Sequence, residues 1–261
     1  MNVLEQIAAH RSIRTYKSDA VPDDAFRHIV ESALRSSSSG NMQTFSIIAT
    51  RDAERRKKLC ELHFDQGMVL EAPLLLTFCA DWNRMNRWCR NRDAEPGFDN
   101  FLCYMVAAGD AFIASQNSAL AAESLGLGIC YMGTTLCNTR KIAEFLRCPQ
   151  DVIPVTTLVV GYPAEDPPTR DRLPLSAILH EEEYRDYTDR DIDRLYRQRE
   201  TEGWKRYQSF PQLFKKAQEA GATNLAQIYT IAKYTQKDNV VFSRDLLALI
   251  DEKGFMNHEV R

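Results

Sequence analysis

Residues 101–125 form the longest stretch with helical character in this chain, FLCYMVAAGDAFIASQNSALAAESL. The stretch is rich in alanine and apolar on nearly every helical face, and Gly126 and Gly128 end it. A helix that is apolar all round must be covered by protein on most of its surface. We therefore expect it to run through the core or along a surface between two subunits.

Composition limits the partners of this protein. The chain has 261 residues, 44% of them hydrophobic and 26% charged, which is enough for one large domain or two small ones. A formal net charge of −3 provides no overall positive field to attract nucleic acid or an anionic membrane. The N-terminal MNVLEQIAAHRSIRTY lacks a secretory pattern, and no run of about 18 apolar residues occurs. We expect a soluble, cytoplasmic protein that binds neither nucleic acid nor membrane.

Cysteines and histidines are scattered in this sequence. There are seven cysteines and five histidines, and no two cysteines form a Cys-x-x-Cys unit. Because a zinc site requires clustered thiolates or imidazoles, we predict no metal site and interpret the cysteines as reduced, mostly buried thiols. The sequence also shows no Ser-His-Asp arrangement and no cysteine redox pair.

Helical and strand patterns are interleaved with spacers of uneven length. We expect helices at 3–10, 52–62 and 139–146, another that starts near Asp23 and ends before four serines, and strands at 45–50, 73–80, 129–132 and 155–161. No Gly-x-Gly-x-x-Gly turn follows a strand, which argues against a doubly wound dinucleotide fold. The pattern favours an α+β fold. Residues 81–98 are expected to form a mobile loop or lid, and the charged, helical region after Glu181 an appendage on one main domain.

One candidate anion site is His10-Arg11-Ser12-Ile13-Arg14, directly after the first expected helix. Two guanidinium groups and a hydroxyl within five residues offer several donors, and arginine suits bidentate contacts to phosphate. The same residues are also ordinary at a helix C-terminus, where basic side chains complement the helix dipole.

Two further segments have related chemistry. Ser36–Ser39, Gly40, Asn41 and Gln43 supply hydroxyl and amide groups that could bind a sugar-like chain, although such residues also simply end helices. Thr169–Pro174 (TRDRLP) carries alternating arginines that an extended loop would aim to one side, although a solvated loop has the same composition.

Taken in order, these segments resemble the FMN-dependent nitroreductase superfamily, and within it the major oxygen-insensitive nitroreductases and flavin reductase P. The resemblance extends from about Val3 to Tyr184. The residues that carry it are His10–Arg14 (HRSIR), Ser37–Gln43 (SSSGNMQ), Gln66, Phe78–Asp81, Gln116-Asn117, Ala121–Gly128 (AAESLGLG), Tyr131–Gly133 and Arg172–Pro174.

The resemblance implies a three-layer fold with a central, mainly antiparallel sheet, in a homodimer with two FMN sites at its interface. It assigns 1–185 to an FMN-binding core and 186–261 to an extension on the core or the partner subunit. The implied FMN-binding residues are His10, Arg11, Ser12 and Arg14; Ser38, Gly40 and Gln43; Gln66; Tyr131, Met132, Gly133 and Thr134; and Arg170 and Arg172.

The implied activity is a ping-pong reaction in which NADPH or NADH donates hydride and an electron-poor acceptor, such as a nitroaromatic or a quinone, receives it. The cofactor supplies the electron chemistry, so no catalytic side chain is expected. Arg14 would assist by stabilising negative charge at the N1/O2 edge of the flavin. Trp82 and Trp88 would either shape acceptor access or anchor the 81–98 segment.

The sequence departs from these relatives at three places. One of them is Arg170, which replaces a lysine that they frequently carry at this position. Thr134 stands where they often have a second glycine, and the region after about Tyr187 is divergent, which leaves the choice between NADPH and NADH open; Arg199, Lys205 and Arg206 are candidate contacts to a 2′-phosphate or simply surface charges. Three other functions stay open: a specialised flavin reductase, a flavin-binding module without turnover, and an interaction protein without cofactor.

Overall fold

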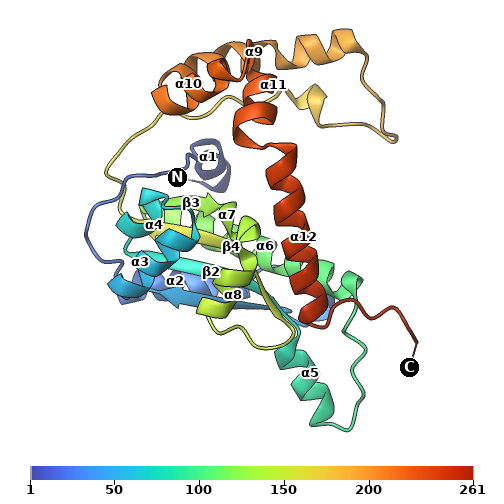
Figure 1. The fold of residues 1–261 in the computed structure, drawn as a ribbon. Coiled ribbons are helices and arrows are strands. Elements are labelled where there is room, and N and C mark those ends of the chain that lie inside the picture. Colours follow the sequence, from blue (N-terminus) through green and yellow to red (C-terminus); the bar gives the residue numbers. More distant parts are fainter. Residues whose placement is uncertain (1, 261) are drawn as a thin grey trace. The chain divides into compact units, whose positions relative to one another are not determined.

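The computed structural model describes residues 2–260 of the chain (Figure 1). They form two compact units: the residues up to Pro168 together with those from Phe242 on, and Thr169–Val241. The two units are defined by how compactly their residues pack. The division into an FMN-binding core and an extension at residue 185 stays a prediction.

An antiparallel sheet forms the centre of the first unit. Its strands are β1 (Phe45–Thr50), β2 (Leu74–Asp81), β3 (Gly128–Met132) and β4 (Val152–Gly161), in the order β1-β2-β4-β3. Every residue of β2 and β4 is buried, as expected for central strands without polar alternation. The β4 strand starts at Val152, earlier than predicted, and includes Pro154, which has no N–H to donate. The sheet accommodates this proline because the pairing register shifts beside it, between Phe78 and Cys79 of β2.

Helices cover both faces of this sheet (Figure 1). The elements are α1 (Val3–Ala8), α2 (Asp23–Leu34), η1 (Ser39–Asn41), α3 (Ala53–Leu62), α4 (Gly67–Glu71), α5 (Asn83–Arg90), α6 (Phe101–Ser124), α7 (Thr134–Cys137) and α8 (Thr139–Phe145). Helix α6 packs along β2 and β4 with α2 beside it, while α7 and α8 pack on β4 from the other face, next to α3. This arrangement is the predicted three-layer α+β fold.

The long apolar helix α6 has two different apolar faces. Its side-chain cap is Asn100, which accepts from the Cys103 N–H at 3.1 Å. Alanines and serines face the core, and a second set of apolar side chains is exposed: Phe101, Leu102, Met105, Phe112 and Ile113. The core therefore covers only part of this helix.

The expectation of a loop at 81–98 is wrong. Residues Asn83–Arg90 form helix α5, preceded by Trp82, which is fully packed in the core. The Trp82 ring stacks on Phe98 with centroids 4.3 Å apart, and its Nε1 donates to the Cys103 carbonyl at 2.7 Å. These contacts make Trp82 a structural anchor, whereas Trp88 is exposed.

The second unit is helical, with its own small core. Its elements are η2 (Leu175–Ala177), α9 (Asp189–Gln208), α10 (Pro211–Glu219), α11 (Leu225–Gln227) and a π-helical turn, η3 (Ile228–Lys233). Tyr207, Ala217, Leu225 and Ile228 are buried together in this core. Among residues 2–260, no helix is long and apolar enough to span a membrane.

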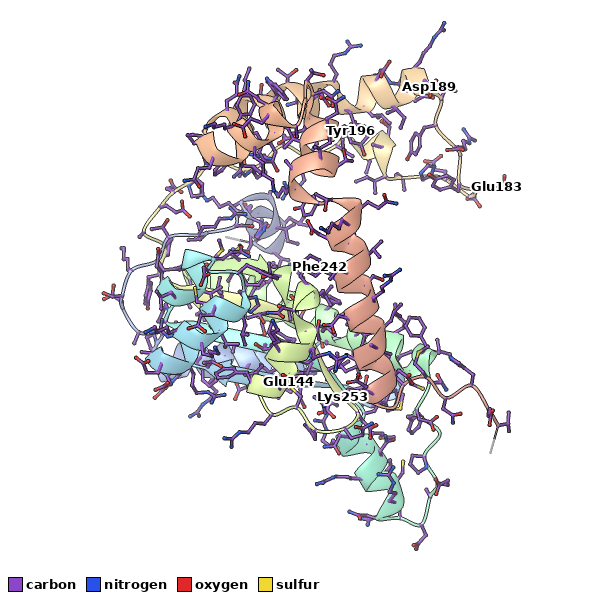
Figure 2. The ribbon with its side chains drawn as sticks, in the orientation of Figure 1. Glu144, Glu183, Asp189, Tyr196, Phe242 and Lys253 are labelled. Carbon is purple, nitrogen blue, oxygen red and sulfur yellow. The ribbon has the colours of Figure 1, made fainter. Side chains whose placement is uncertain are left out.

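Helix α12 (Gln236–Glu252) passes from the second unit into the first. In Figure 2, the stretch of α12 that belongs to the first unit begins at Phe242, and Lys253 directly follows its last residue. Arg140 of α8 pairs with Asp245 at 2.8 Å and with Glu252, which attaches this stretch to α8. Burial of Leu249 and Ile250 completes the attachment.

Candidate functional site

The segment His10–Arg14 lies along the outer edge of β3. Ser12 pairs in parallel with Ile129, and the Ile13 N–H donates to the Ile129 carbonyl at 2.9 Å. The buried Tyr16 hydroxyl donates to the Ile13 carbonyl at 2.7 Å, and burial raises the pKa of Tyr16, which keeps it protonated as a donor. Gly128 allows this close approach, because a Cβ there would lie 2.8 Å from Cβ of Ile13.

The two arginines of this segment have different surroundings. Arg11 Nη1 pairs with Asp166 Oδ1 at 2.8 Å and donates to the Pro167 carbonyl at 3.1 Å. The Arg14 side chain is exposed, and its backbone N–H donates to Glu165, as does that of Thr15. His10 Nδ1 lies 2.6 Å from Glu123 Oε1. Acidic groups therefore hold the backbone and one guanidinium of this segment.

The serine loop, residues 36–43, is held by a residue that the sequence analysis did not single out. Gly40, Asn41 and Gln43 have left-handed backbone conformations, with φ of 57°, 54° and 52°. The buried Asp110 of α6 accepts from the Ser39 N–H at 3.1 Å and from the Thr44 hydroxyl at 2.8 Å. Within the loop, Ser38 Oγ accepts from the Gln43 N–H at 3.0 Å, so two predicted site residues lie together.

Gln66 and Thr134 are also brought together, and His63 joins them. Gln66 Nε2 donates to Thr134 Oγ1 at 3.3 Å, and His63 Nδ1 lies 2.8 Å from the same oxygen. His63 is fully buried, and this burial lowers its pKa to about 4, so the imidazole is neutral at neutral pH.

The remaining predicted residues of this unit follow β3. The half-buried Tyr131 hydroxyl contacts Ser115 Oγ at 3.1 Å and donates to Gln116 Oε1 at 3.3 Å. Met132 is buried, and its carbonyl accepts from the Thr135 hydroxyl. Gly133 is exposed at the start of α7.

Arg170 and Arg172 belong to the second unit, at its start. Both are exposed, and Arg172 Nη1 donates to the Asp171 carbonyl at 3.2 Å. Asp171 in turn pairs with Arg199 of α9, with 3.3 Å between Oδ2 and Nε. Arg199 therefore contacts this loop. The sequence analysis had left two roles open for Arg199, a contact to the nucleotide or a surface charge.

The donor chemistry of the first unit fits an elongated molecule with a phosphate at one end. Guanidinium, hydroxyl and imidazole groups lie at the beginning of β3, and an amide and a hydroxyl lie just after its end. Arginine and serine suit a phosphate, whereas the uncharged groups suit the hydrogen-bonding edge of a heteroaromatic ring. The residues present therefore fit FMN. Among the described residues, no group of three or more His, Cys, Asp or Glu could hold a metal ion.

The sequence analysis missed His63, Asp110 and Glu165. Asp110 carried a usable signal, since it is the single acidic residue within the apolar part of the 101–122 stretch. His63 and Glu165 carried none, because neither belongs to a recognisable local motif.

Comparison with known proteins identifies the family of this chain. Residues 7–162, more than half of the chain, match the Nitroreductase family. The chain belongs to the nitroreductase family. The match covers the whole sheet together with the serine loop, Gln66 and Thr134, and it confirms the resemblance seen in the sequence.

Relatives of this nitroreductase-family protein cover most of its length. The FMN reductase [NAD(P)H] of Bacillus subtilis is 37% identical over 70% of this chain and 74% of its own. The oxygen-insensitive NADPH nitroreductase of Salmonella typhimurium is 36% identical over 69% and 74%, respectively. A putative oxidoreductase from Bacteroides fragilis has a similar structure, with a TM-score of 0.88 and 41% identity over 97% of this chain and 100% of that one. The likeness to the last structure includes the helical region after residue 185.

Proposed function

We propose that this protein is an NAD(P)H-dependent FMN oxidoreductase that passes hydride to an electron-poor small molecule, such as a nitroaromatic or a quinone. The observation that carries the proposal is the line of donors along β3, from the guanidiniums near Ile129 to the amide and hydroxyl after Met132. The family supports the same activity, since its relatives are named as FMN reductase and NADPH nitroreductase.

Each group of residues has a proposed role in holding FMN. Arg11, with His10 and Ser12, binds the phosphate and the adjoining polar chain, and Arg170 and Arg172 form a second phosphate clamp. Ser38, Gly40 and Gln43 bind the polar tail of the cofactor. Gln66 and the stretch Tyr131, Met132, Gly133 and Thr134 contact the ring.

When bound, FMN supplies the two-electron chemistry of the reaction. Arg14 stabilises negative charge at the N1/O2 edge of the ring, which favours transfer of an electron pair. The reduced nicotinamide nucleotide binds first and leaves, and the acceptor then occupies the same space. The protein contributes binding and orientation at both steps.

We further propose a homodimer. The exposed side chains Leu102, Met105, Phe112 and Ile113 lie at spacings of three, seven and one along α6, which places them on one face of the helix. An exposed apolar stripe of this length suits a self-complementary interface. The seven free cysteines suit a reducing compartment, and we propose the cytoplasm.

A flavin reductase is the second candidate, because the Bacillus subtilis relative carries that name. Here free flavin is the acceptor and bound FMN the carrier.

An anaerobic titration tests the activity. Purified protein loaded with FMN is mixed with NADH or NADPH, and the flavin absorbance is followed; a nitroaromatic, a quinone and free FMN are then added separately. We expect rapid bleaching by one or both nucleotides and reoxidation by an acceptor. Bound flavin that neither nucleotide bleaches would indicate a binding module, and protein that never retains FMN would indicate an interaction protein.

A further inference from the structure

His63 has no place in the function described so far, yet it contacts two residues of the proposed ring site. It caps the C-terminus of α3, and the two residues after it, Phe64 and Asp65, have left-handed φ values of 58° and 55°. Asn138 Nδ2 donates to the Leu62 carbonyl at 2.8 Å and holds this turn. The turn brings Gln66 back beside the histidine.

The orientation of the Gln66 amide follows from its contacts. Its Nε2 lies 3.2 Å from the backbone carbonyl of His63 and 3.3 Å from Thr134 Oγ1. A carbonyl oxygen only accepts hydrogen bonds, so the amide nitrogen must face it. Thr134 Oγ1 therefore accepts one hydrogen bond from Gln66.

The tautomer of His63 follows from its burial. Its Nδ1 lies 2.8 Å from Thr134 Oγ1, whereas its Nε2 is buried with no hydrogen-bond partner among the described residues. If Nε2 carried the proton, a buried N–H would have no acceptor, and such donors are rare in folded proteins. Protonation of Nδ1 avoids this, and His63 then donates to Thr134 Oγ1.

We propose that His63 and Gln66 both donate to Thr134 Oγ1 and thereby leave the Thr134 hydroxyl hydrogen to donate to the ring of the bound flavin. His63 is then a positioning residue, and Thr134 is the residue that contacts the cofactor. This inference rests on the proposed function, because the acceptor of the hydrogen bond is FMN.

The consequence is a preference for reduced FMN. Reduction adds electrons to the ring, so a hydroxyl donor binds it more strongly than the oxidised ring. A hydrogen bond to a charged or electron-rich acceptor changes affinity by about tenfold or more. Loss of the Thr134 hydroxyl should weaken binding of reduced FMN by about tenfold relative to oxidised FMN, which lowers the midpoint potential of the bound flavin.

The first test reads the tautomer without the cofactor. Nitrogen-15 NMR of protein labelled at histidine distinguishes protonated from unprotonated ring nitrogens, and His63→Gln identifies the signals of His63. We expect a neutral imidazole protonated at Nδ1, with and without FMN. Signals of an imidazole protonated at Nε2 would overturn the proposal.

The second test uses the midpoint potential of bound FMN, measured by reductive titration with dithionite and a reference dye. Thr134→Val removes the hydroxyl at nearly constant volume, and Thr134→Ser restores it. Thr139→Val is the matched control, because its buried hydroxyl donates to the Thr135 carbonyl on the neighbouring helix. We expect a lower potential in Thr134→Val and the wild-type potential in the other two variants.

Equal potentials in Thr134→Val and Thr139→Val would overturn the inference. Failure of wild-type protein to bind FMN would overturn both this inference and the proposed function. Wild-type protein that binds FMN but is not reduced by NAD(P)H would overturn the proposed function alone, since dithionite still reports the potential. His63→Gln adds a double-mutant comparison: with Thr134→Val it should lower the potential no further than Thr134→Val does.

Discussion

The carboxylate of Asp110 accepts a hydrogen bond from the backbone N–H of Ser39 at 3.1 Å, across 71 positions of sequence. The other oxygen of the carboxylate accepts from the Thr44 hydroxyl, so one buried side chain of α6 holds the first residue of η1 and the residue that follows the loop. The loop includes three left-handed residues, whose conformation costs free energy unless the surroundings hold it.

Replacing Asp110 by Asn should loosen this loop and weaken FMN binding. The loop loses a charged acceptor worth about 1.5–3 kcal/mol per hydrogen bond. We therefore expect the Kd for FMN to rise by about tenfold or more. Fluorescence quenching of FMN measures the Kd. The control is Asp245→Asn, which breaks the pair between Asp245 of α12 and Arg140 of α8 and should lower Tm without changing the Kd. Equal Kd values in the two variants would contradict the prediction.

Arg11→Ala and Arg172→Ala should each lose FMN on gel filtration, because each removes a cation from the proposed phosphate site. The expected loss is about 1.5–3 kcal/mol per charge-assisted hydrogen bond. Arg51→Ala is the control, since Arg51 lies on an exposed turn, pairs with Asp23 and stacks on the Phe26 ring at 4.1 Å. The phosphate assignment does not survive if all three proteins retain FMN equally.

Gly128→Ala should separate the His10–Arg14 segment from β3. The added methyl group would lie 2.6 Å from Cγ1 and 2.8 Å from Cβ of Ile13, and the backbone of one segment must move because Cβ cannot rotate away. We expect a destabilisation of about 1–3 kcal/mol and weaker FMN binding. Denaturant unfolding and FMN titration measure the two effects. Gly97→Ala, where no atom lies within 4 Å of the added group, should change neither.

His63 should make stability fall in mild acid. Its folded pKa of about 4 lies below the ordinary value of 6.5, so the unfolded chain binds a proton in this window and the folded protein does not. The free energy of unfolding is therefore fully retained above pH 6.5 and falls as pH drops toward 4, by about 3 kcal/mol at most. Urea unfolding at several pH values should give a steeper loss for wild type than for His63→Gln. Parallel curves would show that His63 is protonated in the folded protein.

A charge on the exposed stripe of α6 should disrupt the proposed homodimer. Ile113→Glu would bury a carboxylate without a partner in the interface, which is costly. Analytical ultracentrifugation should show monomers for this variant and dimers for wild type. Leu70→Glu places the same charge at an exposed position of α4 and should remain dimeric. A monomeric wild type would contradict the proposal directly.

Local signals were enough to predict most of the elements of the first unit. Strand β1 has the predicted bounds, and α3 begins at Ala53, one residue after the predicted start, and ends at the predicted Leu62. The ordered motifs from His10 to Pro174 also predicted the family. These features depend on periodicity, capping and short motifs, which neighbouring residues specify.

Contacts between distant parts of the chain could not be predicted in this way. Helix α5 was missed because its charged sequence has little apolar face, and burial of Trp82 against Phe98 anchors it. Likewise, His63 meets Thr134 across 71 positions, and Glu165 meets Thr15 across 150. Which residues meet across such distances depends on how the helices and the sheet pack together. A local sequence pattern does not specify that packing.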